Sequence, residues 1–108
     1  MNNYEHTFII RDDSPESQNK KIINKYENII NENSGKVIKI EEWGLRTLSF
    51  KIKNSKKGYY CHIKFEGVGK TIEKLENTEN IDSSLLRYLT VKVKKHDIET
   101  NFFEKKEF

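Results

Sequence analysis

The 108-residue chain has little of several residue types that mark particular protein classes. It contains one cysteine, Cys61, so no disulfide can form within the chain, which fits a reducing compartment. Residues 1–6 lack the basic start and apolar run of a signal peptide. No apolar run approaches the roughly 20 residues that a membrane-spanning helix needs. We therefore expect a soluble, cytoplasmic protein without a membrane partner.

The chain also has only a small excess of positive over negative charge. Twenty Lys and Arg residues against 17 Asp and Glu residues give a formal net charge of +3, which is weak evidence for a polyanionic partner. Hydrophobic and charged residues each make up 34% of the chain, so the core can only be small. We expect residues 1–95 to form a single domain and residues 96–108 to form a flexible, charged tail.

What the chain does have is clear periodicity. Alternation predicts strands at residues 3–11, 36–52, 59–66 and 85–94. A first helix is predicted to begin at Ser14-Pro15-Glu16 and to end with Gly35 as a left-handed cap, and a second is predicted to follow Gly67 and reach Asn80. The expected apolar side chains of the two helices are Ile22, Ile23, Tyr26, Ile29 and Ile30, and then Val68, Ile72 and Leu75.

This order of elements predicts an α+β fold of the ferredoxin-like βαββαβ type. Such a fold is a four-stranded antiparallel sheet with both helices on one face. The other face should carry Tyr60 and His62, with some of Ile9, Arg87, Leu89 and Val91. Because apolar and aromatic side chains on an uncovered sheet face often mark an interaction site, we expect a binding surface there. The alternative is a mixed surface that binds nothing, and the alternation does not assign the two faces of the last strand.

The most informative stretch is residues 41–52. Leu48, Phe50 and Ile52 alternate with polar residues, as in a strand with one buried face. Gly44 interrupts the run and predicts a bulge that would turn Trp43 and Arg46 out of the regular ladder. An aromatic ring and an arginine beside a bulge suit a binding surface. In the alternative interpretation, Trp43 caps the core and Arg46 is an ordinary solvated charge.

Motifs for catalysis or cofactor binding are incomplete. The segment Gly67-Val68-Gly69-Lys70-Thr71 resembles the end of a phosphate-binding loop, but Lys64 stands where the first glycine belongs. Adjacent residues of a strand face opposite sides, so Cys61 and His62 cannot act as nucleophile and base for each other. We expect Cys61 and His6 to be buried structural residues, and the pairs Asp12-Asp13 and Glu41-Glu42 to be solvated. The sequence therefore predicts no metal site, cofactor, small-molecule substrate or catalytic residue.

Positive charge gathers at two places. Lys51, Lys53, Lys56 and Lys57 surround the turn between the second and third strands, and Lys92, Lys94, Lys95 and His96 close the last strand. With Arg46, Arg87 and nearby aromatic residues, this pattern is similar to a phosphate-contacting rim around a stacking surface. Simple solubility explains the charge alone nearly as well.

Several segments resemble one known family. Over residues 3–94 the chain is similar to the sixth protein of the bacterial small ribosomal subunit. The segments that carry the similarity are Gly44-Leu45-Arg46 followed by residues 48–53, Ser14-Pro15-Glu16, Gly35-Lys36-Val37, Gly58-Tyr59-Tyr60 and Leu86-Arg87. The chain departs from the family pattern at Asn2, where the family is often basic, at Thr47, where a charged or amide residue is usual, and at Phe50, where tyrosine is usual.

The resemblance implies a ribosomal, non-catalytic protein that forms a heterodimer with the eighteenth small-subunit protein. The pair would bind the central domain of the small-subunit rRNA. We expect RNA contacts from Tyr4, Arg46, Arg87, Lys92 and Lys94, and partner contacts from Trp43, Tyr60, His62, Leu89 and Val91.

Two other functions fit the same fold, because a fold alone does not set a function. The first is an acylphosphatase-type enzyme, which needs a glycine-rich anion cradle after the first strand, whereas residues 11–15 are acidic and lack glycine. The second is a ligand-sensing domain that dimerises through its sheet.

Overall fold

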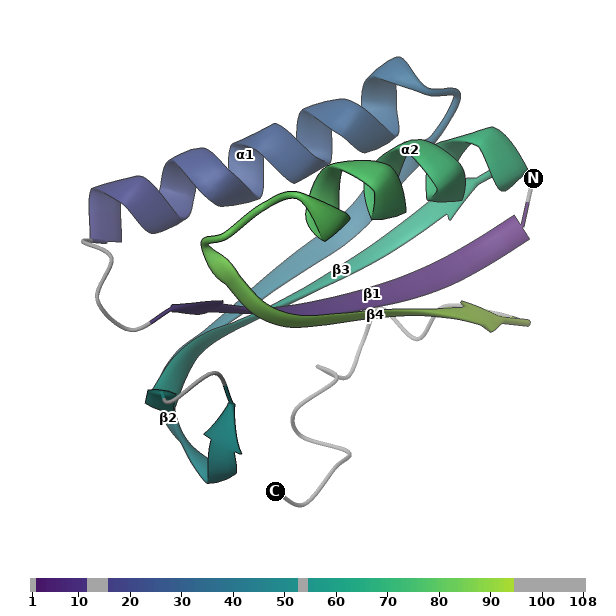
Figure 1. The fold of residues 1–108 in the computed structure, drawn as a ribbon. Helices are drawn as coiled ribbons and strands as arrows, with labels where there is room; N and C mark the ends of the chain where they lie inside the picture. Colours follow the sequence, from purple (N-terminus) through teal and green to yellow (C-terminus); the bar gives the residue numbers. More distant parts are fainter. Residues whose placement is uncertain (1, 12–15, 53–54, 95–108) are drawn as a thin grey trace.

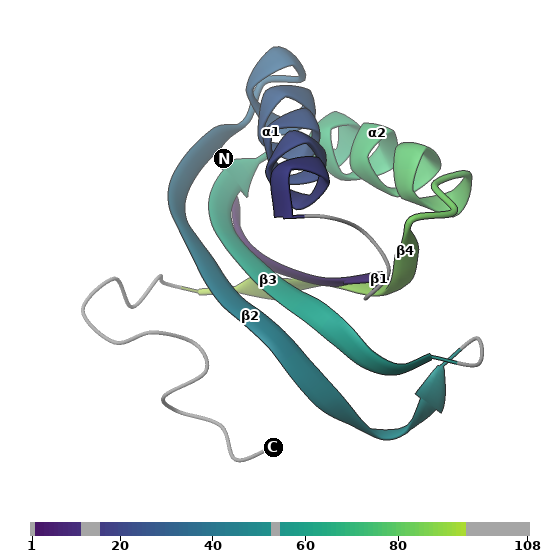
Figure 2. The ribbon, with the colours of Figure 1, turned by 90° about the vertical axis from the view of Figure 1, so that its left-hand side faces the viewer.

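The computed structural model describes residues 2–11, 16–52 and 55–94. Their order is β1 (Asn2–Arg11), α1 (Glu16–Glu32), β2 (Lys36–Ile52), β3 (Ser55–Gly67), α2 (Gly69–Asn80) and β4 (Leu85–Val93). The strands form one antiparallel sheet in the order β2-β3-β1-β4. Both helices lie on the same face of this curved sheet (Figures 1 and 2). The predicted ferredoxin-like fold is therefore confirmed.

Some predicted features lie outside the described residues. They are the Ser14-Pro15 helix start, the Asp12-Asp13 pair, the Lys53-Asn54 turn and the tail from residue 95 onward. Strand β3 begins at Ser55, four residues before the predicted start at residue 59, because the basic segment continues the ladder and Lys57 pairs with Thr47.

The main core lies between the helices and the sheet. The side chains of Phe8 from β1, Phe65 from β3 and Leu75 from α2 are completely buried. Tyr26 of α1 is also buried and packs against Phe8, with ring centroids 5.4 Å apart. Cys61 faces this core, as predicted, and burial raises the pKa of its thiol. The helical stripe of α1 and the alternation of β1 thus meet in one cluster.

A buried polar link crosses the edge of this core. His6 Nε2 lies 2.5 Å from Glu79 Oε2 of α2, and His6 Nδ1 lies 2.7 Å from Thr90 Oγ1 of β4. Burial raises the pKa of the Glu79 carboxyl group. The predicted structural role of His6 is confirmed, since its buried ring links β1 to α2 and to β4.

Two details at the helix ends differ from prediction. Ser34, with φ of 67°, is the left-handed residue after α1, so the predicted left-handed cap at Gly35 is wrong. Glycine is needed at position 35 because a Cβ there would lie 2.7 Å from both Cγ2 and the carbonyl oxygen of Ile30. Val68 was expected on the buried side of α2, but it precedes the helix and is exposed, while Thr71 and Glu79 are buried beside Leu75.

Candidate protein and nucleic-acid interface

The sheet face opposite the two helices is called the open face below. Strand register arranges its residues in rows that cross all four strands. The first row is Gly44, Tyr60, Ile9 and Arg87, the second is Glu41, His62, Thr7 and Leu89, and the third is Lys39, Lys64, Glu5 and Val91. The structure therefore brings Tyr60, His62, Arg87, Leu89 and Val91 onto one face.

An irregularity in β4 explains why alternation could not assign the faces of that strand. The pairing with β1 shifts between Ile9 and Ile10, so Ile9 pairs with Arg87 and Ile10 pairs with Leu85. Leu85 consequently enters the core beneath the helices, while Leu86 packs against Ile9 on the open face. The neighbouring residues Leu86 and Arg87 therefore share the open face, whereas a regular strand would place them on opposite faces, as expected when a strand carries one extra residue.

The predicted bulge in β2 is present. The pairing with β3 shifts between Glu42 and Gly44, and Gly44 has φ of +85°, a conformation that favours glycine. The Arg46 guanidinium carbon lies 4.4 Å from the centre of the Trp43 ring. Trp43 meets Tyr60 edge to face, with ring centroids 6.3 Å apart. These three side chains, called the Trp43 cluster below, combine a cation–π contact with an aromatic pair.

A small apolar cluster supports the Trp43 cluster. Leu48 of β2, Ile9 of β1 and Leu86 of β4 are buried together, and Tyr60 packs against them. Leu48 therefore belongs to the buried face predicted for its strand, but that face is the open face of the sheet and not the helix side. The side chains of Phe50 and Ile52 lie outside the described residues.

The centre of the open face consists of polar side chains that are largely buried. Thr7 Oγ1 lies 2.7 Å from His62 Nδ1, and His62 Nε2 lies 3.4 Å from Glu5 Oε1. Lys64 Nζ lies 3.7 Å from Glu41 Oε2. His62 and Lys64 are each 1% exposed, and burial lowers the pKa of His62. The expectation that Glu41 is a solvated charge is wrong, because it is buried with Lys64.

The apolar part of the open face lies along β4. Leu89 is 63% exposed and Val91 is 47% exposed. Arg87, on the same face of β4, is also exposed. The open face therefore has three parts, which are the Trp43 cluster, a buried polar centre and an apolar edge flanked by an arginine.

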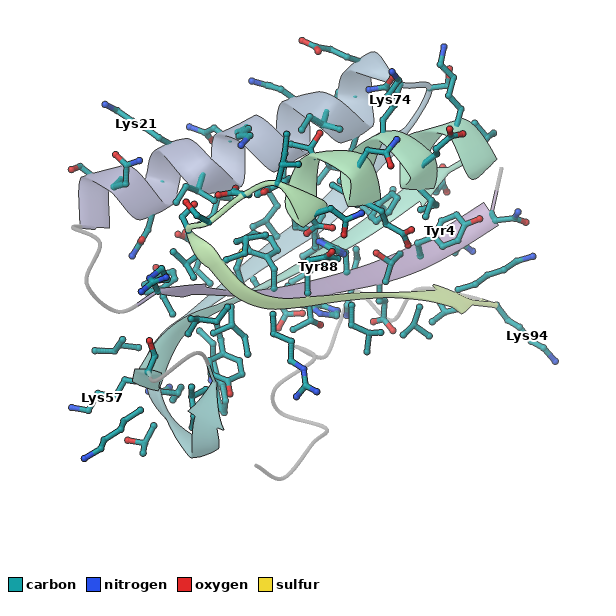
Figure 3. All side chains as sticks on the ribbon, viewed as in Figure 1. Tyr4, Lys21, Lys57, Lys74, Tyr88 and Lys94 are labelled. Atoms are coloured by element: carbon teal, nitrogen blue, oxygen red, sulfur yellow. The ribbon has the colours of Figure 1, made fainter. Side chains whose placement is uncertain are left out.

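The remaining predicted RNA residues lie at the other end of the sheet. Tyr4 pairs with Lys92 and faces the helix side, where its half-buried ring stacks on Phe65 with centroids 5.5 Å apart. Lys92 and Lys94 line a shallow depression with Asn2, Asn3 and Val93. Figure 3 shows Tyr4 and Lys94 at the same end of the molecule. The predicted RNA set is thus divided between this end, Arg46 of the Trp43 cluster and Arg87 beside the apolar edge of β4.

The sequence reasoning missed four residues of the polar centre, namely Glu5, Thr7, Glu41 and Lys64. Glu5 and Thr7 share the parity of Ile9 in β1, which was the available signal for their face. Within the described ranges, no group of three or more His, Cys, Asp or Glu residues could hold a metal ion. None of the described helices is long and apolar enough to span a membrane.

Comparison with known proteins gives a consistent result. The profile of the family described as ribosomal protein S6 matches residues 3–92. A small ribosomal subunit protein bS6 of Pelagibacter ubique is 48% identical over 107 residues, which cover 99% of this chain and 88% of that protein. The bS6 protein of Parvibaculum lavamentivorans is 38% identical over 89% of this chain and 62% of its own length. The crystal structure of 30S ribosomal protein S6 from Thermotoga maritima is similar with a TM-score of 0.82 and 30% identity, over 85% of this chain and 87% of that one.

Proposed function

Because the chain belongs to the ribosomal protein S6 family, we propose that it forms a heterodimer with the eighteenth small-subunit protein and that this pair binds the central domain of the small-subunit rRNA. Membership of the family makes the chain a structural component of the small ribosomal subunit and not an enzyme. The acylphosphatase alternative is thereby set aside. We assign the protein contact to the open face, and the RNA contact to Arg46 and Arg87 together with Tyr4, Lys92 and Lys94 at the other end of the sheet.

The observation that carries the protein contact is the exposed apolar edge of β4. Leu89 and Val91 leave much of their apolar surface in contact with water, and burial against a partner would remove that surface from water. Trp43 and Tyr60 add aromatic groups of the kind that dominate binding energy at protein interfaces. His62 is buried in the polar centre, so its part in the interface is to hold the shape of this face.

The RNA contact is assigned to exposed cations. Arg46, Arg87, Lys92 and Lys94 are all exposed and can approach phosphate oxygens. Tyr4 enters this set through its position beside Lys92 in the β1–β4 pair. We expect Arg87→Ala to weaken binding to the RNA–partner complex by about 1–3 kcal/mol and to reduce the salt dependence. Unchanged affinity and salt dependence would remove Arg87 from the site.

The protein contact is tested by a double substitution, Leu89→Asp with Val91→Asp. The control is Ile81→Asp, because Ile81 is 85% exposed and lies in the loop between α2 and β4, away from the open face. Affinity for the purified eighteenth protein should fall roughly tenfold or more in the double variant, as for two interface residues, and should stay near the native value in the control. Equal affinities of the native chain and the double variant would contradict the assignment, provided that circular dichroism shows both to be folded.

A further inference from the structure

Charge is divided unevenly along the chain. Residues 43–65, which span most of the β2–β3 hairpin, contain six Lys or Arg residues and no Asp or Glu. The rest of the chain contains 14 Lys or Arg residues and 17 Asp or Glu residues. The small positive net charge of the whole protein is therefore the sum of a basic hairpin segment and a slightly acidic remainder.

The end of this hairpin projects from the body of the protein. The last residue of β1, Arg11, pairs with Gly58, and the pairs Thr47 with Lys57 and Ile52 with Ser55 lie beyond it. Within the described ranges, this end is a two-stranded ribbon of β2 and β3. Figure 2 shows it extending away from both helices.

Lysines are exposed on this ribbon. Lys56 and Lys57 are both exposed. Figure 3 shows Lys57 at the hairpin end, whereas Lys21 and Lys74 project from the two helices on the other side of the sheet. Lys51 and Lys53 belong to the same segment of the sequence.

The ribbon is firmly attached at its base. Leu48 of β2 is buried against Ile9 and Leu86 of the neighbouring strands. At Gly58 the backbone of β3 comes so close to β1 that a Cβ would lie 2.2 Å from Ile9 Cγ2. A ribbon anchored in this way holds its charges in a fixed direction, so less entropy is lost when it binds.

We propose that the end of the β2–β3 hairpin, marked by Lys56 and Lys57, is a separate contact for the phosphate backbone of the rRNA. This proposal rests on the proposed function, because that function makes rRNA the partner. The surface that it uses is separate from the open face. Lysine acts on phosphate as a compact point charge, so the contact adds affinity and orientation without reading base sequence. The contact should therefore depend strongly on salt.

The test compares two pairs of adjacent, exposed lysines. Lys56→Gln with Lys57→Gln removes the hairpin charges, and Lys20→Gln with Lys21→Gln removes the same charge from α1. Binding of each variant, with the eighteenth protein, to a transcript of the rRNA central domain is measured across about 50 to 200 mM salt. The hairpin variant should lose roughly tenfold in affinity and show a slope of log affinity against log salt that is shallower by about 1.5 to 2, while the α1 variant matches the native chain.

A second readout places the contact on the RNA. An iron chelate tethered at Lys57→Cys should cleave the transcript locally, and one at Lys21→Cys should not. The native Cys61 is buried and would not take up the reagent in the folded chain.

The outcomes separate the two proposals. A native slope in the hairpin variant, or equal cleavage from both tethers, overturns the hairpin contact and leaves the proposed function standing if Arg87→Ala still weakens binding. Loss of binding to the eighteenth protein in the absence of RNA would reassign the hairpin to a protein contact and would also overturn the inference. If the native chain binds neither RNA nor partner, the proposed function fails, and the hairpin contact fails with it.

Discussion

Replacing His62 by glutamine should reduce the loss of stability that this protein suffers in mild acid. The His62 ring is buried on the open face, between Thr7 and Glu5. Burial lowers the pKa of His62, although the hydrogen bond with Glu5 opposes part of this effect. In the unfolded chain a histidine titrates near pH 6.5. At a pH below about 6.5, the unfolded chain therefore binds more protons at this site than the folded protein.

The sign and size of the effect follow from that difference. When the unfolded state binds more protons, the free energy of unfolding decreases as the pH falls. A single histidine that stays neutral in the folded protein would lower this free energy by about 1 kcal/mol between pH 7.5 and 5.5. Glutamine can still form a hydrogen bond with Thr7, so His62→Gln should fold, and its stability should lack this part of the pH dependence.

The assay is urea unfolding of both proteins at about pH 7.5, 6.5 and 5.5. Trp43 is the single tryptophan and provides the fluorescence signal. Titrating groups that do not contact His62, such as Glu79 and Asp82, are the same in both proteins and cancel in the difference. The stability advantage of the native chain over the variant should shrink by about 1 kcal/mol from pH 7.5 to 5.5. A difference that stays constant, or that increases in acid, would refute the assigned role of burial at His62.

Two further predictions concern packing. Gly58→Ala should lower the free energy of unfolding by about 1–3 kcal/mol, because the added Cβ would collide with Ile9. Gly69→Ala should have little effect, because nothing lies within 4 Å of its Cβ position. The midpoints of urea unfolding measure both changes, and equal midpoints for the two variants would contradict the close contact at Gly58. The Cys61 thiol is buried and its pKa is raised. It should therefore react with an alkylating reagent far more slowly in the folded protein than in urea. Similar reaction rates in the two states would show that this part of the core opens readily.

Local patterns predicted the elements correctly where one side of an element is buried and the other is solvated. Ile22, Tyr26 and Ile30 recur at helical spacing because they share the buried side of α1. Phe8 and Ile10 stand two residues apart because both face the helices from β1. Gly44 marked the β2 bulge because a positive φ favours a residue without a side chain.

The errors at Gly35 and Glu41 concern contacts that the periodicity of a single segment does not show. Gly35 is required by the side chain and carbonyl of Ile30 and by the approach of Thr71, and not by its own φ. Glu41 is buried because register places it near Lys64 of the next strand. Charge alone does not reveal such a pair, since most carboxylates in a sequence of this composition are solvated.

By itself, the sequence determined the order of the elements, the helix-facing core and the gathering of positive charge near the β2–β3 turn and the end of the last strand, because these follow from the residue types and their spacing along one segment. Tertiary structure alone decided that His62 meets Thr7, 55 positions away, and that the β4 irregularity places Leu86 on the same face of the sheet as its neighbour Arg87. The physical reason is that spacing fixes where a side chain points relative to its own strand, whereas its neighbour depends on how remote strands are aligned.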